Sequence, residues 1–152
     1  MATGTAMSDT MEKDLLERWL KNTTTNMGAV PANVYVGLGT AVSGEASNAL
    51  TEPSTTRGYT RQAITFGATA VGSGTPPSAT TGIQITGPSG SAVTFGPNTV
   101  SDWGSITHFG VYNNQTVGSG ELMFWGALGS SVSIQVNDSF QFATGSITIT
   151  AD

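Results

Sequence analysis

Cysteine is absent from the chain, and basic residues and long apolar runs are scarce. Without cysteine the protein cannot form disulfides, thiolate zinc sites or a cysteine nucleophile. No apolar run approaches the roughly 18 residues that a membrane helix needs. The N-terminus also lacks the basic start and apolar stretch of a secretion signal. We therefore expect a soluble, unprocessed protein that has no membrane partner.

Positive charge is confined to the first part of the chain. Five basic residues stand against ten acidic ones, which gives a formal net charge of −5. Binding to a phosphate backbone needs clustered lysine and arginine, so we expect no nucleic-acid partner. Any electrostatic docking should involve the N-terminal part, because no basic residue follows position 61. The five residues are Lys13, Arg18, Lys21, Arg57 and Arg61.

Small and hydroxylated residues dominate the composition, with 20 Gly, 24 Thr and 16 Ser among 152 residues. Only 10% of the residues are charged, against about 25% in an average globular domain. This composition excludes a helical bundle covered in glutamate and lysine. Short strands joined by many turns are the structure that it favours.

The most helix-like segment is residues 9–21, where apolar residues recur with the helical period. Asp9 is suited to cap its N-terminus, with Glu12 three residues later. We predict an N-terminal arm, residues 1–27, that carries this helix, and a β-domain, residues 28–152. An isolated short helix is marginally stable, so its apolar stripe must pack on its own β-domain or on a neighbouring subunit. The stripe consists of Met11, Leu15, Leu16, Trp19 and Leu20.

Beyond the arm, apolar and polar residues alternate in short segments, which is the pattern of β-strands. Turn residues separate the segments, a spacing typical of a sandwich or small barrel. Two stretches, 41–57 and 67–82, have no clear period, and we predict loops there. We predict an all-β fold: a jelly-roll-like β-sandwich of about eight strands with one short N-terminal helix. The predicted strands are 34–38, 59–66, 83–85, 93–95, 106–112, 121–128, 132–136, 140–142 and 147–149.

The strand predicted at 121–128 is apolar on both faces. Leu122 and Phe124 alternate with Met123 and Trp125, so both sides of this strand need a cover. One cover is the opposing sheet, and the other is the helix, a loop or another subunit. We take this strand as an indication of oligomerisation. The candidate core or subunit-contact residues are Trp103, His108, Phe124 and Trp125.

One short segment, 102–108, brings an acid, a hydroxyl and an imidazole together. On a single strand Ser105 and His108 would point to opposite faces, so the imidazole could not act as the base for the hydroxyl. Calcium ligation would need Asp102, Glu121 and Asp138 to meet, and their spacing matches no calcium motif. We therefore predict no catalytic residue, no metal site and no cofactor.

Two segments carry a family resemblance. Residues 102–112, Asp-Trp-Gly-Ser-Ile-Thr-His-Phe-Gly-Val-Tyr, precede residues 120–128, Gly-Glu-Leu-Met-Phe-Trp-Gly-Ala-Leu. Together with residues 33–40, 58–66 and 136–149 they resemble a family of small β-rich virion proteins of tailed bacteriophages and prophages, often called phage tail fiber proteins. The resemblance covers most of the chain in order, and residues 1–8 and the two predicted loops depart from it.

The resemblance implies a non-enzymatic structural role in the virion, which is assembled in the bacterial host cytoplasm. We predict a capsid cement or decoration protein that is a homotrimer and binds the major capsid protein or other virion proteins. The alternative is a structural or receptor-binding protein of a tail fibre or tail tip. Fibre shafts usually contain long repeats or coiled coils, and their absence from this sequence favours the capsid. The candidate docking or subunit-interface residues are Met11, Leu15, Trp19, Arg57 and Arg61.

Overall fold

The computed structural model describes residues 5–20, 32–44, 49–67, 70–71 and 83–151. The described part of the chain is mostly β-structure with one α-helix, which confirms the predicted all-β class with an N-terminal helix. The helices are α1 (Asp9–Leu20) and the 3-10 helix η1 (Thr55–Arg57). The strands are β1 (Thr5–Met7), β2 (Val34–Gly39), β3 (Ala41–Val42), β4 (Leu50–Thr51), β5 (Gln62–Ile64), β6 (Ala70–Val71), β7 (Ile83–Gly87), β8 (Val93–Phe95), β9 (Gly104–Tyr112), β10 (Leu122–Ile134), β11 (Phe140–Phe142) and β12 (Ile147–Ala151).

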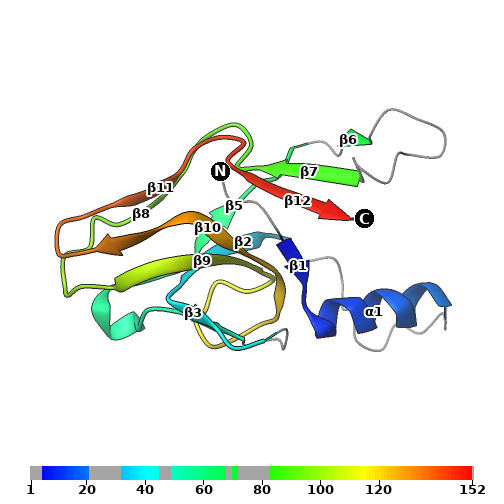
Figure 1. Ribbon diagram of the computed structural model, residues 1–152, viewed down its shortest axis with the longest axis horizontal. Helices are drawn as coiled ribbons and strands as arrows, with labels where there is room; N and C mark the ends of the chain where they lie inside the picture. The colour runs from blue at the N-terminus through cyan, green and yellow to red at the C-terminus, as the bar shows by residue number, and fades with distance from the viewer. Residues whose placement is uncertain (1–4, 21–31, 45–48, 68–69, 72–82, 152) are drawn as a thin grey trace.

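The largest sheet has five strands in the order β1-β10-β9-β2-β5, and every neighbouring pair is antiparallel. Its centre is the hairpin of β9 and β10. β2 comes from much earlier in the chain and pairs with β9 from Tyr35 to Gly39. In Figure 1, β7, β8, β11 and β12 lie on one side of β9 and β10, and β3 lies on the other side.

The main hydrophobic core lies between the five-stranded sheet and two smaller sheets, β12-β7-β6 and β11-β8. Phe142 of β11 links the layers, since its ring centroid lies 5.9 Å from that of Phe109 on β9; it also lies 6.2 Å from that of Phe95 in its own sheet. These pairs adopt the edge-to-face geometry that aromatic rings favour. The buried core residues are Val36, Leu38, Tyr59, Ile64, Phe95, Trp103, Ile106, Phe109, Val111, Ile134, Phe142, Ile147 and Ile149.

β10 is one strand of 13 residues, where we predicted two strands, 121–128 and 132–136. Its pairing with β9 shifts between Ala127, opposite His108, and Val132, opposite Ile106. Residues 128–131 of β10 therefore lie opposite the single residue Thr107 of β9. The extra residues form a bulge within one strand, and the chain does not reverse there. The Gly-Ser-Ser sequence at 129–131 is the turn signal that misled the prediction.

The outer face of β2 and β9 is lined with glycine. A Cβ atom on Gly110 would lie 2.6 Å from Leu122 Cδ1 and 2.9 Å from Leu50 Cδ2. Glycine is thus needed where the Leu50 side chain rests on the strands. Leu50 belongs to the antiparallel pair of β3 and β4. The prediction of a structureless loop at 41–57 is therefore wrong, because this stretch contains β3, β4 and η1 and covers the sheet.

This cover answers the question raised by the apolar strand 121–128. A second hydrophobic cluster forms on the outer face from buried Ala49, Leu50, Tyr112 and Leu122, with Val42 and Trp125 partly buried at its margin. On the core side, Met123 and Phe124 pack against the main cluster. The chain itself therefore packs on both faces of this strand, although Met123, Phe124 and Trp125 are only partly buried.

The N-terminal arm adds an edge strand to the five-stranded sheet, which the sequence did not predict. β1 pairs with residues 124–126 of β10, and Ser8, fully buried, connects β1 to α1. The Ser8 hydroxyl accepts a hydrogen bond from Met11 N (3.3 Å), and the Ser8 carbonyl accepts one from Glu12 N (3.0 Å). Ser8, and not Asp9 as predicted, therefore caps α1.

Several sequence predictions concern residues outside the described ranges. Lys21, the predicted boundary between residues 27 and 28, and most of the loop predicted at 67–82 lie outside them. The predicted strand 59–66 is shorter, since only β5 is strand there. The jelly-roll arrangement stays a prediction. Among the described residues no helix is long and apolar enough to span a membrane.

Candidate functional site

The segment 102–108 does not form a catalytic triad. Asp102 Oδ1 accepts a hydrogen bond from Val136 N (3.0 Å), and His108 Nδ1 is bonded to the Thr107 hydroxyl (2.7 Å). Ser105 is exposed, and its strand position faces Ser133 of β10. The acid and the imidazole therefore have other partners.

The three carboxylates weighed for calcium do not meet. Asp102 and Asp138 bind the backbone amides of Val136 and Gln135, just beyond the C-terminal end of β10. Glu121 immediately precedes the start of the same strand and is bonded to Asn113. Among the described residues no three histidine or acidic side chains cluster closely enough to hold a metal.

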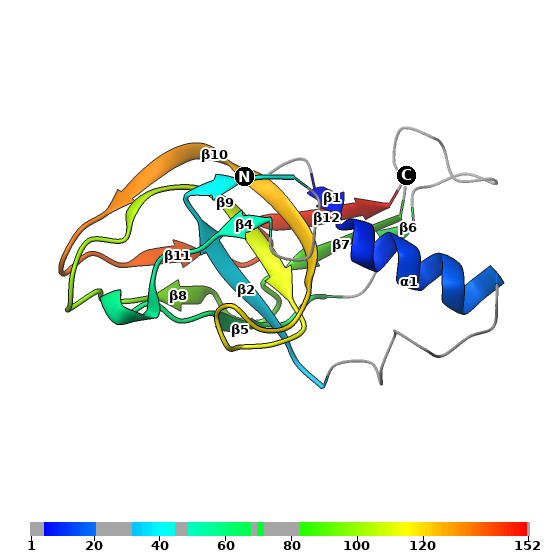
Figure 2. The ribbon, with the colours of Figure 1, turned by 90° about the horizontal axis from the view of Figure 1, so that it is seen from below.

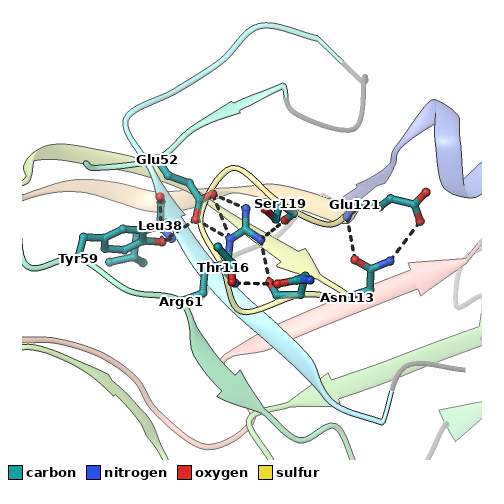
Figure 3. Close-up of polar contacts among 9 residues, drawn as sticks. Leu38, Glu52, Tyr59, Arg61, Asn113, Thr116, Ser119 and Glu121 are labelled. Carbon is teal, nitrogen blue, oxygen red and sulfur yellow. Dashed lines mark hydrogen bonds and ion pairs between the residues drawn. The ribbon is translucent and has the colours of Figure 1, made fainter. Parts of the chain in front are cut away.

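The most organised polar site is a buried ion pair between Arg61 and Glu52, whose side chains are 3% and 5% exposed. Arg61 Nη2 lies 2.6 Å from Glu52 Oε2, and Arg61 Nε donates to both carboxylate oxygens at 3.0 and 3.1 Å. The guanidinium also stacks on the ring of Tyr112, 3.4 Å from its centroid. Figure 3 shows this pair between the β-sheet and the 113–121 loop that joins β9 to β10.

Two tyrosines complete the site. Tyr59 Oη donates to Glu52 Oε1 (2.9 Å) and accepts a hydrogen bond from Leu38 N (2.7 Å). Burial, and secondly the Glu52 carboxylate, raise the pKa of both Tyr59 and Tyr112 well above the usual tyrosine value. Both phenols therefore remain protonated at any physiological pH. We call Glu52, Tyr59, Arg61 and Tyr112 the Arg61 cluster.

The Arg61 cluster holds the 113–121 loop. Arg61 Nη1 donates to the carbonyls of Asn114 and Ser119, each at 2.8 Å. At the base of the loop, Asn113 and Glu121 exchange three hydrogen bonds, of 2.8, 3.2 and 3.3 Å. A pocket of about 270 Å³ lies between the loop and the cluster. Because Glu52 neutralises Arg61, this site fixes a loop and offers no free positive charge to an anion.

These positions revise the predicted docking residues. Arg61 is only 2% exposed, so its side chain cannot act as a surface contact, and that prediction is wrong. Arg57 is exposed, but its guanidinium donates to the Asp102 carbonyl (2.6 Å) and its own carbonyl accepts from Trp103 Nε1 (2.9 Å). We did not predict Glu52. Few acidic residues occur in the β-domain sequence, and this rarity was the signal that could have marked Glu52 as a candidate.

The predicted core residues divide into two groups. Trp103 is buried in the main core, and its ring meets that of Tyr59 edge-on, with centroids 5.4 Å apart. His108, Phe124 and Trp125 are only partly buried. The rings of His108 and Trp125 are neighbours, with centroids 6.0 Å apart.

The predicted docking stripe on α1 is also divided. Met11 and Leu15 are partly buried, whereas Leu16 and Leu20 are exposed. Trp19 belongs to α1, but its side chain lies outside the described part of the structure. The helix packs against β10 and lies at the opposite end of the molecule from η1 (Figure 2).

Comparison with known families agrees with the resemblance seen in the sequence. Residues 6–150 match the model of a family described as "Podophage GP4 fiber I protein gp80". No curated protein matches the chain. The family match includes most of the arm as well as the β-domain. The chain therefore belongs to this phage fiber protein family and is a structural component of the virion.

Proposed function

We propose that the protein is a component of the phage tail fibre apparatus, bound to the particle as a small β-module. The observation that carries this proposal is the match of residues 6–150 to a family described as a podophage fiber protein. It moves our preference from capsid cement, which the sequence favoured, to the fibre alternative. The structure supports a non-catalytic role, since its best-organised polar groups bind one another and backbone carbonyls.

The two ends of the molecule differ in a way that suits such a module. At the η1 end, hydrogen bonds join two loops: Asn98 N donates to the Asp138 carbonyl (2.9 Å), and Asn137 N donates to the Asn98 carbonyl (2.6 Å). At the other end, α1 projects beside β1 and exposes apolar side chains. An end whose loops are joined by hydrogen bonds and an end that exposes two leucines are suited to different tasks, presentation and attachment.

Capsid cement remains a second candidate, because an arm joined to a compact domain could also clamp neighbouring capsomers with the avidity of many fixed sites. The number of copies per virion separates the two functions. Quantitative mass spectrometry of purified particles should give a few dozen copies or fewer for a fibre component. Hundreds of copies would overturn the fibre proposal in favour of cement, and gold-labelled antibodies should place the protein on the tail or the shell accordingly.

The predicted homotrimer is a separate proposal. Sedimentation equilibrium of the purified full chain should give three times the monomer mass. A monomer would contradict it, and this result would leave the fibre proposal standing.

A further inference from the structure

α1 is oriented so that it exposes much of its apolar stripe. Leu16 and Leu20, one turn apart, are 60% and 77% exposed, whereas Asp14 on the opposite side is 4% exposed. An amphipathic helix that packs only on its own domain normally turns its leucines inward and its acids outward. We call Leu16 and Leu20, with the charged residues beside them, the α1 ridge.

The surroundings of the α1 ridge are acidic. A shallow hollow of about 440 Å³ runs along it, lined by Asp9, Glu12, Lys13, Leu16, Glu17 and Leu20. Lys13 is ion-paired with Glu17, with 3.7 Å between Nζ and Oε1. Among the described side chains that line the hollow, Asp9 and Glu12 in the first turn therefore leave a net negative charge.

We propose that the α1 ridge seats in an apolar groove, rimmed by lysine or arginine, on a different protein of the virion. This inference rests on the proposed function, and it names the chemistry of the attachment partner. Two apolar side chains spaced by four residues are the anchors by which an amphipathic helix enters a groove. Basic residues at the rim would complement the acids at the start of the helix and guide the approach.

Charge argues against the β-domain of a second copy as the partner. The described residues of the β-domain include two cations, Arg61, which is buried, and Arg57, which is exposed. Arg57 donates to the Asp102 carbonyl, and the exposed carboxylates of Asp102 and Asp138 accept from the neighbouring amides of Val136 and Gln135. That surface therefore offers no basic rim. A lipid surface fits equally poorly, because membrane-surface helices carry lysine and arginine on their polar face and bind anionic lipids.

The test is an add-back experiment with particles that lack the protein. Purified full-length chain is mixed with these particles, and the bound copies are counted. Replacing Leu16→Glu and Leu20→Glu together should lower binding at least about tenfold for each leucine. The matched control replaces two exposed valines at the η1 end, Val100→Glu and Val136→Glu, and should leave binding unchanged. Unchanged thermal midpoints in both variants show that folding is intact.

Two further arms identify the partner. Glu12→Lys should weaken binding, and added salt should weaken the wild type more than this variant. A photoreactive residue in place of Leu20 should cross-link to one virion protein, within an apolar segment flanked by lysine or arginine.

Equal binding of the wild type and the leucine variant would overturn the α1 ridge as the attachment site, while the proposed function would stand. Loss of self-association in the leucine variant, or binding of the wild type to vesicles of anionic phospholipid, would show a different occupant and also overturn it. A wild-type chain that does not bind the particles at all would defeat the proposed function and this inference together.

Discussion

Removal of the Arg61 guanidinium is the perturbation that the structure predicts most sharply. In an Arg61→Met variant the Glu52 carboxylate would remain buried, at 5% exposure, without its counter-charge. Breaking a buried pair from one side costs about 3–5 kcal/mol. The carbonyls of Asn114 and Ser119 would also lose their donor, although they can turn to water when the loop opens. We therefore expect the free energy of unfolding to fall by about 4 kcal/mol.

The assay is urea unfolding followed by tryptophan fluorescence, with the midpoint and slope fitted separately. Arg57→Met is the matched control, because Arg57 is exposed and donates to a single backbone carbonyl. We expect it to cost less than about 1 kcal/mol. Total stabilities of small domains are about 5–15 kcal/mol, so the Arg61 variant should be measured at low temperature.

A double variant distinguishes the buried charge from simple loss of packing. Glu52→Gln removes the orphaned charge and keeps an oxygen acceptor for Tyr59. The double variant should therefore be at least as stable as Arg61→Met alone. Its loss of stability should be smaller than the sum of the two single losses by about 1–3 kcal/mol. Strictly additive losses, or a cost below about 1 kcal/mol for Arg61→Met alone, would refute the account of the Arg61 cluster.

Three further predictions concern the same region and the two cores. Folding raises the pKa of Tyr59, so above about pH 10, the pKa of an unfolded tyrosine, the unfolded state binds fewer protons than the folded state. The free energy of unfolding should then fall by about 1.4 kcal/mol per pH unit. Tyr59→Phe should reduce this slope in urea titrations at pH 9 to 11. Gly110→Ala should cost about 1–3 kcal/mol because its Cβ would press on two leucines, whereas Gly67→Ala, with neighbours at 3.6 Å, should be tolerated; equal urea midpoints would contradict this. Trp103→Phe should lower stability more than Trp125→Phe does. Trp103 Nε1 donates to a carbonyl, whereas Trp125 Nε1 has no hydrogen-bond partner within the described structure. The reverse order of thermal midpoints would contradict this prediction.

The alternation of apolar and polar residues located most strands, but it missed a bulge and two very short strands. Periodicity predicted β8, β9, β11 and β12 closely, because each buries one face in the core and so needs alternation. It failed at residues 129–131, where small residues that favour turns also suit a bulge. It failed again at residues 41–57, where two-residue strands are too short to show a period.

The Arg61 cluster could not be predicted from the sequence for a different reason. Glu52 and Arg61 are close in sequence, but the loop that they hold lies more than 50 residues later. Only the tertiary fold brings the Asn114 and Ser119 carbonyls to the guanidinium. The count of basic residues suggested a docking role, since lone arginines are usually exposed, and burial beside a carboxylate reversed that conclusion.

The placement of the cations bears on how identical copies can approach one another. Both arginines of the β-domain donate to backbone carbonyls of their own chain, and one of them is buried. The remaining basic residues belong to the arm, at positions 13, 18 and 21. A β-domain whose exposed charges are mainly acidic gives weak electrostatic attraction between copies. We therefore expect specific attachment to depend on the arm, where the exposed leucines of α1 are larger and more exposed than the β-domain valines at positions 100, 132 and 136.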